Sequence, residues 1–485
     1  MPLAERIHLI KSQKRAWETL SPECIVPLRS DWNGAYPIPQ PFRHGAHFID
    51  YNRLDPERPG FSSYFDPYQD VLFLIQAPPS FSTQYVVCIF ITSLKSNGQR
   101  IHPLASKTVL WVDRSEICRP RLSVSGEHLA ALFTDGERSV VIWNWKTGQK
   151  IVHMAISEWE SRQPDRFSDF VFLSSNAFMM VGYSCLHLYT LPRTMDVGLL
   201  ADVTLQLPPH NCIAGQAGDI IRCFTAPFCG TLPPEYTAFR LDPRERIHVL
   251  EISMNDEELA AYIVINTAQL LRILNDVSIH NAKPGQTHTD WELWGPTRTT
   301  IIALPWEMRA IIDNMSIHGT RMAMSWMICK DPPQYRHAIY DFSQKRDPGR
   351  TGGKAHTAVG TGLRMSYEFY ANGKGEIADK ALCGAVFKSS VYNTMPFSVT
   401  ELRPTYFRKF RQLILGRDYI LALVPSLGES RKDAEQFDFD PDEAWQVLER
   451  DMTIAGFPPG TGRLVFEGDS QDPDRYPFQS CFFLF

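Results

Sequence analysis

Short apolar runs alternate with turn-forming residues along most of this chain. After Ser21 the runs are rich in Val, Ile, Phe and Tyr, and clusters of Gly, Pro, Asn and Asp separate them. This texture is typical of many β-strands joined by turns, so it predicts an all-β fold for residues 21–485. Ahead of it, apolar residues recur at helical spacing between Leu3 and Trp17, which predicts an amphipathic helix over residues 1–20.

The clearest unit is a meander between Leu122 and Val152. Its predicted strands are His128–Phe133 and Ser139–Trp145, and its turns are Ser125-Gly126-Glu127, Thr134-Asp135-Gly136 and Lys146-Thr147-Gly148. Along the second strand, residues of both parities are apolar, so we expect both of its faces to be covered by stacked sheets. The ending Trp143-Asn144 followed by Thr-Gly is typical of the last part of a propeller blade, with Asn144 where the usual repeat has Asp.

Related units follow the meander. They are Phe170–Leu173 with Ala177–Gly182 and Leu186–Tyr189; Arg246–Ser253 with Leu259–Asn266 and Gln269–Leu274; and Ile311–Ile317 with Thr320–Trp326 and His337–Phe342. Tyr189 lies 46 residues after Trp143, close to the roughly 40 to 45 residues of a blade. The pattern predicts a WD40-like β-propeller of about seven blades, with six or eight as alternatives. Longer spacings elsewhere predict insertions, namely a flexible Gly-rich loop at 345–364 and a short helix at 440–451.

Charge and cysteine usage narrow the class of protein. The chain has 485 residues and a net charge of −5 without a basic block, which gives no electrostatic reason to expect nucleic acid or an anionic membrane surface. Ten cysteines are scattered through apolar runs, which favours reduced thiols and a cytoplasmic or nuclear location. No signal-peptide core and no membrane-spanning run of about 20 apolar residues is present in the sequence.

Patterns that suggest enzyme chemistry are incomplete. Gly349–Ala355 has the wrong spacing for a phosphate-binding loop and lacks its hydroxyl, so we expect a linker there. His210, Cys212, Cys223 and Cys229 could supply metal ligands, but they contain no Cys-x-x-Cys pair. Asp438, Asp440, Asp442 and Glu449 have calcium-loop spacing, yet Glu443 replaces the required Gly, and Asp440-Pro441 with Glu443 fits a helix start better.

Trp291–Pro296 and two arginines remain as candidates for structural or binding roles. The large apolar area of Trp291 and Trp294, next to Gly295 and Pro296, predicts a packing corner. Arg298 and Arg321 could anchor blades through backbone or carboxylate groups, or could face a ligand. We therefore name no catalytic, cofactor-binding or metal-binding residue, and we expect no cofactor and no enzymatic activity.

Five strings in one order carry a family resemblance. They are Phe65-Asp66-Pro67-Tyr68-Gln69-Asp70-Val71-Leu72, His102-Pro103-Leu104-Ala105, Trp291-Glu292-Leu293-Trp294-Gly295-Pro296, His318-Gly319-Thr320-Arg321 and Ile339-Tyr340-Asp341-Phe342. Together they resemble the propeller-like C-terminal region of the F-box proteins of mushroom-forming (basidiomycete) fungi. Arg6–Leu20 resembles the helix that follows the F-box in that family. The resemblance covers roughly residues 3–424.

The resemblance implies a substrate-recognition propeller of an SCF-type ubiquitin ligase. In that family the F-box binds the adaptor Skp1, and here only Met1-Pro2-Leu3-Ala4 precedes the helix that would follow an F-box. We therefore expect a module that binds a protein or peptide on a propeller face and that contacts Skp1 and cullin only if an F-box lies upstream. A WD40-like scaffold unrelated to ubiquitin and a propeller hydrolase are the alternatives.

Overall fold

The computed structural model of the chain describes residues 24–28, 36–38, 47–49, 62–66, 69–76, 85–93, 100–114, 120–134, 138–155, 166–191, 201–212, 220–225, 245–254, 259–279, 287–304, 315–330, 333–343, 365–370, 387–388, 397–402, 412–415, 419–423 and 480–484. Most of these residues form antiparallel β-sheets. The chain divides into two compact units. The larger unit comprises Asn33–Ala303 and Glu376–Thr394, and the smaller unit comprises Met1–Trp32, Leu304–Gly375 and Met395–Phe485.

Within the described residues, the larger unit contains four consecutive sheets of four or five strands and one short hairpin. The first sheet is β4 (Ser62–Asp66), β5 (Val71–Gln76), β6 (Tyr85–Ser93) and β7 (Val109–Arg114). The second is β8 (Arg121–Ser125), β9 (His128–Phe133), β10 (Ser139–Asn144) and β11 (Gln149–Ala155). The hairpin is β2 (Tyr36–Ile38) and β3 (His47–Ile49).

The third and fourth sheets continue the same up-and-down order. The third is β12 (Phe167–Ser174), β13 (Ala177–Gly182), β14 (Cys185–Thr190) and β15 (Val203–Gln206), extended by the parallel strand β19 (His288–Thr289). The fourth is β16 (Ile220–Thr225), β17 (Ile247–Met254), β18 (Leu259–Asn266) and β20 (Thr299–Leu304).

The predicted meander is confirmed at its strands and at two of its turns. Gly126 and Gly148 adopt φ angles of 58° and 70°, a conformation that glycine tolerates without strain. The side-chain oxygen of Asn144 accepts the backbone N–H groups of Lys146 and Thr147, each at 3.1 Å. Asn144 therefore closes the turn after β10, as a short polar side chain at that position should.

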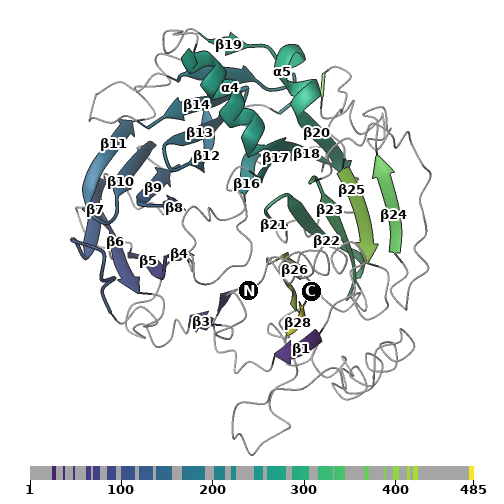
Figure 1. Cartoon of the computed structure of the whole chain (residues 1–485), viewed down its shortest axis with the longest axis horizontal. Helices are drawn as coiled ribbons and strands as arrows, with labels where there is room; N and C mark the ends of the chain where they lie inside the picture. Colours follow the sequence, from purple (N-terminus) through teal and green to yellow (C-terminus); the bar gives the residue numbers. More distant parts are fainter. Residues whose placement is uncertain are drawn as a thin grey trace, which may run out of the picture. The chain divides into compact units, whose positions relative to one another are not determined.

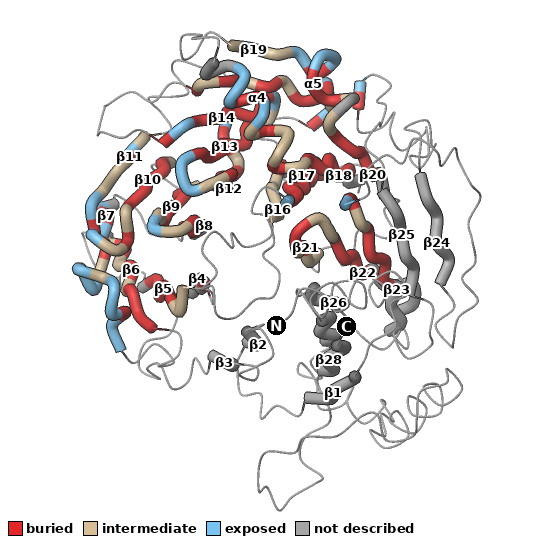
Figure 2. The backbone as a smooth tube through the Cα atoms, in the orientation of Figure 1, coloured by how far each residue is buried: buried red, intermediate tan, exposed pale blue. Residues whose placement is uncertain are grey.

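Successive sheets of the larger unit stack through their apolar faces. Figure 2 shows that many residues of their strands are buried. One cluster joins the first and second sheets and includes Phe73 and Trp143. The next joins the second and third sheets and includes Val140 and Phe178. Because Val140 and Trp143 lie on opposite faces of β10, the expectation that both faces of this strand are covered is confirmed.

The first strands of these sheets lie next to one another. Strand β4 contacts β8, β8 contacts β12, and β12 contacts β16 (Figure 1). We call β4, β8, β12 and β16 the inner strands. This arrangement is typical of stacked meanders, in which the first strand of each sheet lies beside the first strand of the sheet before it.

A buried histidine ties the first two sheets together. The backbone N–H of Leu104 donates to Nδ1 of His102 at 3.2 Å, so the other ring nitrogen carries the hydrogen and donates to the Gln69 carbonyl at 3.0 Å. The ring also meets Trp145 edge-on at 5.0 Å, and the Trp145 indole N–H donates to the Gly126 carbonyl at 2.9 Å. The His102-Pro103-Leu104 string is therefore a structural junction.

The prediction of a strand at Gln269–Leu274 is wrong, because this segment lies in helix α4 (Thr267–Ile279). Leu270, Ile273 and Leu274 are buried at helical spacing. The helix starts directly after β18, where the Asn266 side chain accepts the N–H of Ala268 at 2.8 Å. Asn266 is thus an N-cap, and Gln269 three residues later is the usual companion in a capping box.

The segment Trp291–Pro296 is also helical rather than a corner fixed by proline. It forms α5 (Trp291–Arg298), with Pro296 inside the helix. The expected packing is confirmed, because both indoles are buried and meet edge-on at 5.2 Å. Helices α4 and α5 and strand β19 lie in the chain between β18 and β20, so this insertion separates two neighbouring strands of the fourth sheet.

The smaller unit contains two further sheets within the described residues. One is β21 (Ser316–His318), β22 (Arg321–Lys330), β23 (Pro333–Asp341), β25 (Phe397–Leu402) and β24 (Met365–Tyr370). The other is β26 (Gln412–Leu415), β27 (Tyr419–Leu423), β28 (Ser480–Leu484) and β1 (Cys24–Leu28). Strand β1 thus pairs with β28, the last strand of the chain.

The strands predicted at Thr320–Trp326 and His337–Phe342 are confirmed by the longer β22 and β23, except that the end residues Thr320 and Phe342 lie just outside them. Of Ile311–Ile317, residues 311–314 lie outside the described residues, and the described strand begins at Ser316.

Several predictions fall outside the described residues. They are the helix over 1–20, the Gly-rich loop at 345–364, the helix at 440–451, the Gly349–Ala355 linker and the Asp438–Glu449 segment. Within the described part no sheet closes on itself, and a ring of about seven blades stays a prediction. No helix in the described part is long and apolar enough to cross a membrane.

Candidate functional site

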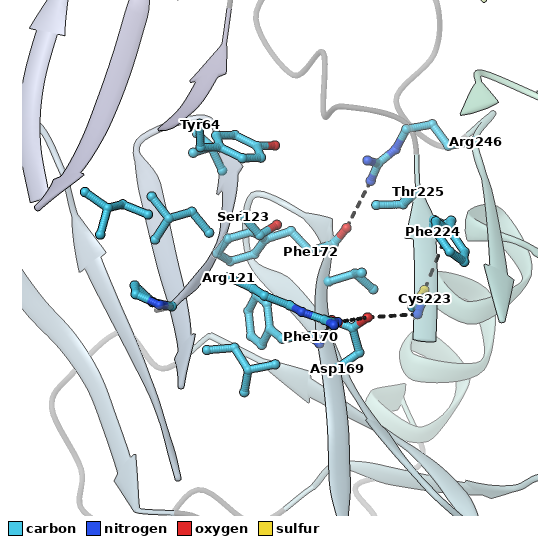
Figure 3. Close-up of a pocket in the computed structure, with 16 residues that line it drawn as sticks. Tyr64, Arg121, Ser123, Asp169, Phe170, Phe172, Cys223, Phe224, Thr225 and Arg246 are labelled. Atoms are coloured by element: carbon cyan, nitrogen blue, oxygen red, sulfur yellow. Dashed lines mark hydrogen bonds and ion pairs between the residues drawn. The ribbon is translucent and has the colours of Figure 1, made fainter. Parts of the chain in front are cut away.

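The inner strands of the larger unit border a cavity of 510 Å³ (Figure 3). We call it the inner-strand cavity. It is lined by Tyr64, Ile75, Pro120, Arg121, Leu122, Ser123, Val124, Leu132, Asp169, Phe170, Val171, Phe172, Cys223, Phe224, Thr225 and Arg246. The lining combines aromatic rings, hydroxyls, two arginines and one carboxylate.

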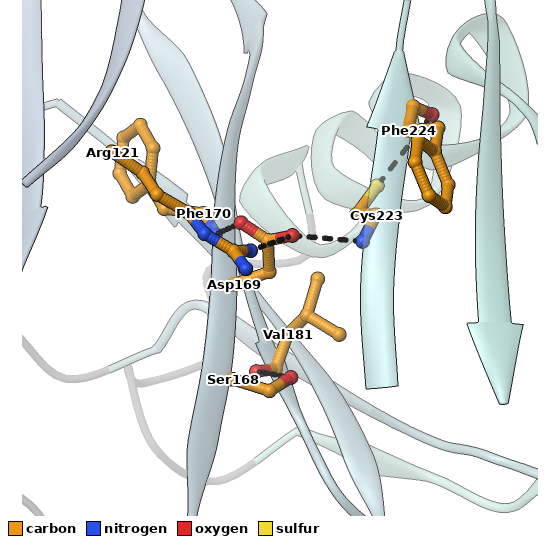
Figure 4. Close-up of polar contacts among 7 residues, drawn as sticks. All are labelled: Arg121, Ser168, Asp169, Phe170, Val181, Cys223 and Phe224. Atoms are coloured by element: carbon orange, nitrogen blue, oxygen red, sulfur yellow. Dashed lines mark hydrogen bonds and ion pairs between the residues drawn. The ribbon is translucent and has the colours of Figure 1, made fainter. Parts of the chain in front are cut away.

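Asp169 links three neighbouring inner strands (Figure 4). From β12, its Oδ2 atom accepts Nη1 of Arg121 on β8 at 3.1 Å and the backbone N–H of Cys223 on β16 at 2.8 Å. Its Oδ1 atom accepts the N–H of Phe170 at 2.9 Å. Burial raises the pKa of the Asp169 carboxyl, against the lowering effects of Arg121 and the two N–H groups.

Side chains of β12 alternate between a face that packs on the second sheet and a face that packs on the fourth sheet. Phe170 and Phe172 belong to the cluster shared with the second sheet, whereas Val171 belongs to the cluster shared with the fourth. Asp169 has the parity of Val171, so it faces β16. Arg121 extends from β8 toward this carboxylate, as Figure 3 shows.

Arg246 is the second arginine of the cavity lining. It precedes β17 and is 3% exposed. Its Nη2 atom donates to the carbonyls of Phe172 at 3.2 Å and Leu173 at 3.0 Å, which links the fourth sheet to β12. The walls of the cavity are therefore held by charged side chains that bridge strands far apart in sequence.

Cys223 is poorly suited to be a nucleophile. Burial raises the pKa of its thiol well above the ordinary value, and the Asp169 charge raises it further, against a smaller lowering by Arg246. A reactive cysteine needs the opposite, a thiol that ionises near neutral pH. Cys88, Cys185, Cys212 and Cys223, the cysteines whose side chains are described, are all free thiols.

The structure does not assemble the sequence-derived metal candidates. His210 shares a hydrogen bond with the Tyr183 carbonyl at 2.6 Å, Cys212 is buried in the apolar cluster between the third and fourth sheets, and Cys223 lines the inner-strand cavity. Cys229 lies outside the described residues. The described part of the chain contains no group of three or more His, Cys, Asp or Glu residues placed to hold a metal ion.

The two arginines selected from the sequence do not line the cavity. Arg321 pairs with Asp341 across β22 and β23, with 3.2 Å between Nε and Oδ2. The pair joins neighbouring strands of one sheet, so it has a structural role within that sheet. Arg298 is partly buried at the end of α5.

Sequence reasoning missed Arg121, Asp169 and Arg246. The one available signal was Asp169, a charged residue directly before the apolar run Phe170–Leu173. A carboxylate in such a strand needs a partner, because burial of an unpaired charge is strongly unfavourable. No local pattern identifies Arg121 as that partner, since 48 residues separate the two.

No protein-family model and no curated protein matches this sequence. Among solved structures, the WD40 domain of SCAP from fission yeast is similar, with a TM-score of 0.29, 8% identity, and coverage of 77% of this chain and 75% of that one. Hsv2 from Kluyveromyces lactis gives a TM-score of 0.23 and 10% identity, with coverage of 42% and 67%. The uncharacterised protein lmo1340 from Listeria monocytogenes EGD-e gives 0.29 and 8%, with coverage of 64% and 75%. These values establish no family membership for this chain.

Proposed function

We propose that the chain is a protein-interaction module of the propeller type and that its inner-strand cavity binds a segment of a partner protein. The observation that carries this proposal is the cavity itself. Its volume of 510 Å³ lies within the range of ligand-binding pockets in proteins, which is roughly 300 to 1,000 Å³. Tyr64 and Arg121 are of the residue types that contribute most binding energy at protein interfaces, and Phe224 is of a type that is enriched there.

Preorganisation supports the same conclusion. Asp169 and Arg246 fix the strands that form the walls, so a ligand would not have to order them. Binding to a prepared site loses less conformational entropy than binding to a mobile one. A propeller scaffold with inserted loops on its faces suits this role.

The test starts from a selection of peptides. A random-peptide phage library is selected on the immobilised full chain, and the enriched peptides are synthesised with a fluorophore. Fluorescence anisotropy then gives their affinity for the wild type, for Ser123→Trp and for Ser106→Trp. Ser123 lines the cavity, whereas Ser106 is exposed and lies outside its lining.

The proposal predicts that Ser123→Trp weakens binding by about tenfold or more, because the indole fills the cavity, whereas Ser106→Trp has little effect. Far-UV circular dichroism and the thermal transition show whether each variant is folded. If Ser123→Trp is unstable, Phe224→Ala replaces it, since this change removes a contact without adding volume. Equal affinity for all folded variants would refute the cavity as the binding site.

A finer proposal rests on the resemblance to the fungal F-box proteins. We propose that the partner is a substrate of an SCF-type ubiquitin ligase and that the module works in the cytoplasm or nucleus. A pull-down with purified Skp1 tests this, with the chain as given and with a version extended upstream to include any F-box. The extended version should bind Skp1, and the chain as given should not. If no upstream F-box exists, the scaffold unrelated to ubiquitin replaces this proposal.

A further inference from the structure

Arg121 lines the inner-strand cavity, and only one nitrogen of its guanidinium makes a hydrogen bond within the described part of the chain. In the described part of the chain its one polar contact is the bond from Nη1 to Asp169. Its side chain is 49% exposed, whereas that of Asp169 is 8% exposed. Because a guanidinium has five N–H donors, the edge formed by Nε and Nη2 is available to a ligand.

Asp169 holds this guanidinium in a defined orientation. The carboxylate is itself fixed by the N–H groups of Phe170 and Cys223. An arginine that is anchored at one nitrogen loses less freedom when it binds a ligand with the others. Arg121 is therefore prepared for recognition, unlike a mobile surface arginine.

The charges around the cavity favour an anion. Two arginines and one carboxylate line it, and Arg246 is buried beside the Phe172 and Leu173 carbonyls. Ser123 also lines the cavity, and a hydroxyl can donate to an anion as well. Because these three charged side chains carry a net positive charge, the lining attracts negative charge.

We infer that the segment bound in the inner-strand cavity presents an Asp or Glu side chain, whose carboxylate pairs with Nε and Nη2 of Arg121. This inference rests on the proposed function, because it names the chemistry of the segment that the cavity accepts. A planar carboxylate matches the arginine edge with two parallel hydrogen bonds, which a lysine at this position could not form.

The test is a double-mutant cycle on the selected peptides. In each peptide every Asp and Glu is replaced in turn by Asn or Gln, and affinity is measured for the wild type and for Arg121→Gln. We expect one acidic position whose neutralisation weakens binding to the wild type by about tenfold and has little effect on Arg121→Gln. Arg121→Lys should recover only part of the affinity.

Two further variants keep the result interpretable. Arg121→Gln leaves the buried Asp169 without its cation, so the double variant Arg121→Gln/Asp169→Asn provides a neutral pair in which no charge is left buried and unpaired. Arg272→Gln removes one positive charge from an exposed position on α4, outside the cavity lining. It should leave the effect of the acidic peptide residue unchanged.

The outcomes separate this inference from the proposed function. Peptides that lose affinity for Ser123→Trp but contain no acidic position coupled to Arg121 would overturn the inference and leave the proposed function intact. An acidic residue that matters equally to the wild type and to the folded double variant would also overturn it. Peptides insensitive to Ser123→Trp would refute the proposed function.

Discussion

Gly295 gives a sharp test of how α5 packs. A Cβ atom at this position would lie 2.3 to 2.4 Å from three ring atoms of Trp291. Real Cβ contacts are far longer, so the ring would have to move. It has little room, because Trp291 is 4% exposed and meets Trp294 edge-on, and the Trp294 indole N–H donates to the Gln206 carbonyl at 2.8 Å.

The two physical effects of Gly295→Ala have opposite signs. Alanine in a helix gains up to about 1 kcal/mol over glycine. Overpacking of a filled core costs about 1 to 3 kcal/mol, and three close contacts place this site at the upper end. We therefore expect Gly295→Ala to lower the free energy of unfolding by about 1 to 2 kcal/mol. Urea unfolding followed by tryptophan fluorescence and circular dichroism measures it.

Leu293 and Trp291 supply the controls. Leu293 is 73% exposed on the same helix, so Leu293→Ala should change stability by about 0.5 kcal/mol or less. The double variant Gly295→Ala/Trp291→Leu should be more stable than the sum of the single changes predicts, because the smaller side chain relieves the clash. An unchanged or higher unfolding free energy for Gly295→Ala would refute the packing argument.

Three other predictions concern the interior. Trp145→Phe removes the hydrogen bond to the Gly126 carbonyl and part of the contact with His102. It should therefore lower the free energy of unfolding, measured in urea, by about 2 to 3 kcal/mol. A decrease below about 0.5 kcal/mol would show that Trp145 and His102 do not stabilise the junction of the first two sheets. Burial and Arg246 hold the pKa of His248 well below its ordinary value, so the folded protein favours the neutral imidazole. Below about pH 6.5 the unfolded chain therefore binds a proton that the folded protein does not. The free energy of unfolding should fall by up to about 1.4 kcal/mol for each pH unit of acidification in this range. Urea titrations across this range should show a weaker loss in His248→Gln, and equal slopes would count against the assignment. Cys223, with its raised pKa, should react with iodoacetamide much more slowly in the native protein than in urea at pH 7, as peptide mass spectrometry would show; equal rates would contradict it.

The sheets were predictable where local signals agree. His128–Phe133 and Ala177–Gly182 are continuous apolar runs bounded by turn residues, and the structure has strands at these positions. The two helices were missed because short apolar runs fit both strand and helix periodicity. At Asn266 the N-cap and Gln269 were present in the sequence and would have favoured a helix.

The inner-strand cavity could not be predicted in the same way. Its charged residues come from separate sheets, and Asp169 meets the backbone of Cys223, which lies 54 residues further along the chain. That proximity depends on how the sheets stack, which no local spacing encodes. The same holds for Arg246 and the Phe172 carbonyl, 74 residues apart.

Photo-cross-linking from inside the cavity shows whether a bound peptide occupies it. The photoreactive residue p-benzoylphenylalanine replaces Phe224, which lines the cavity, or Leu293, which is exposed outside the cavity lining on α5. The full chain is then irradiated with a selected peptide. We expect a cross-link to the peptide from position 224 and none from position 293. A peptide that still binds but cross-links from position 293, and not from position 224, would contradict it.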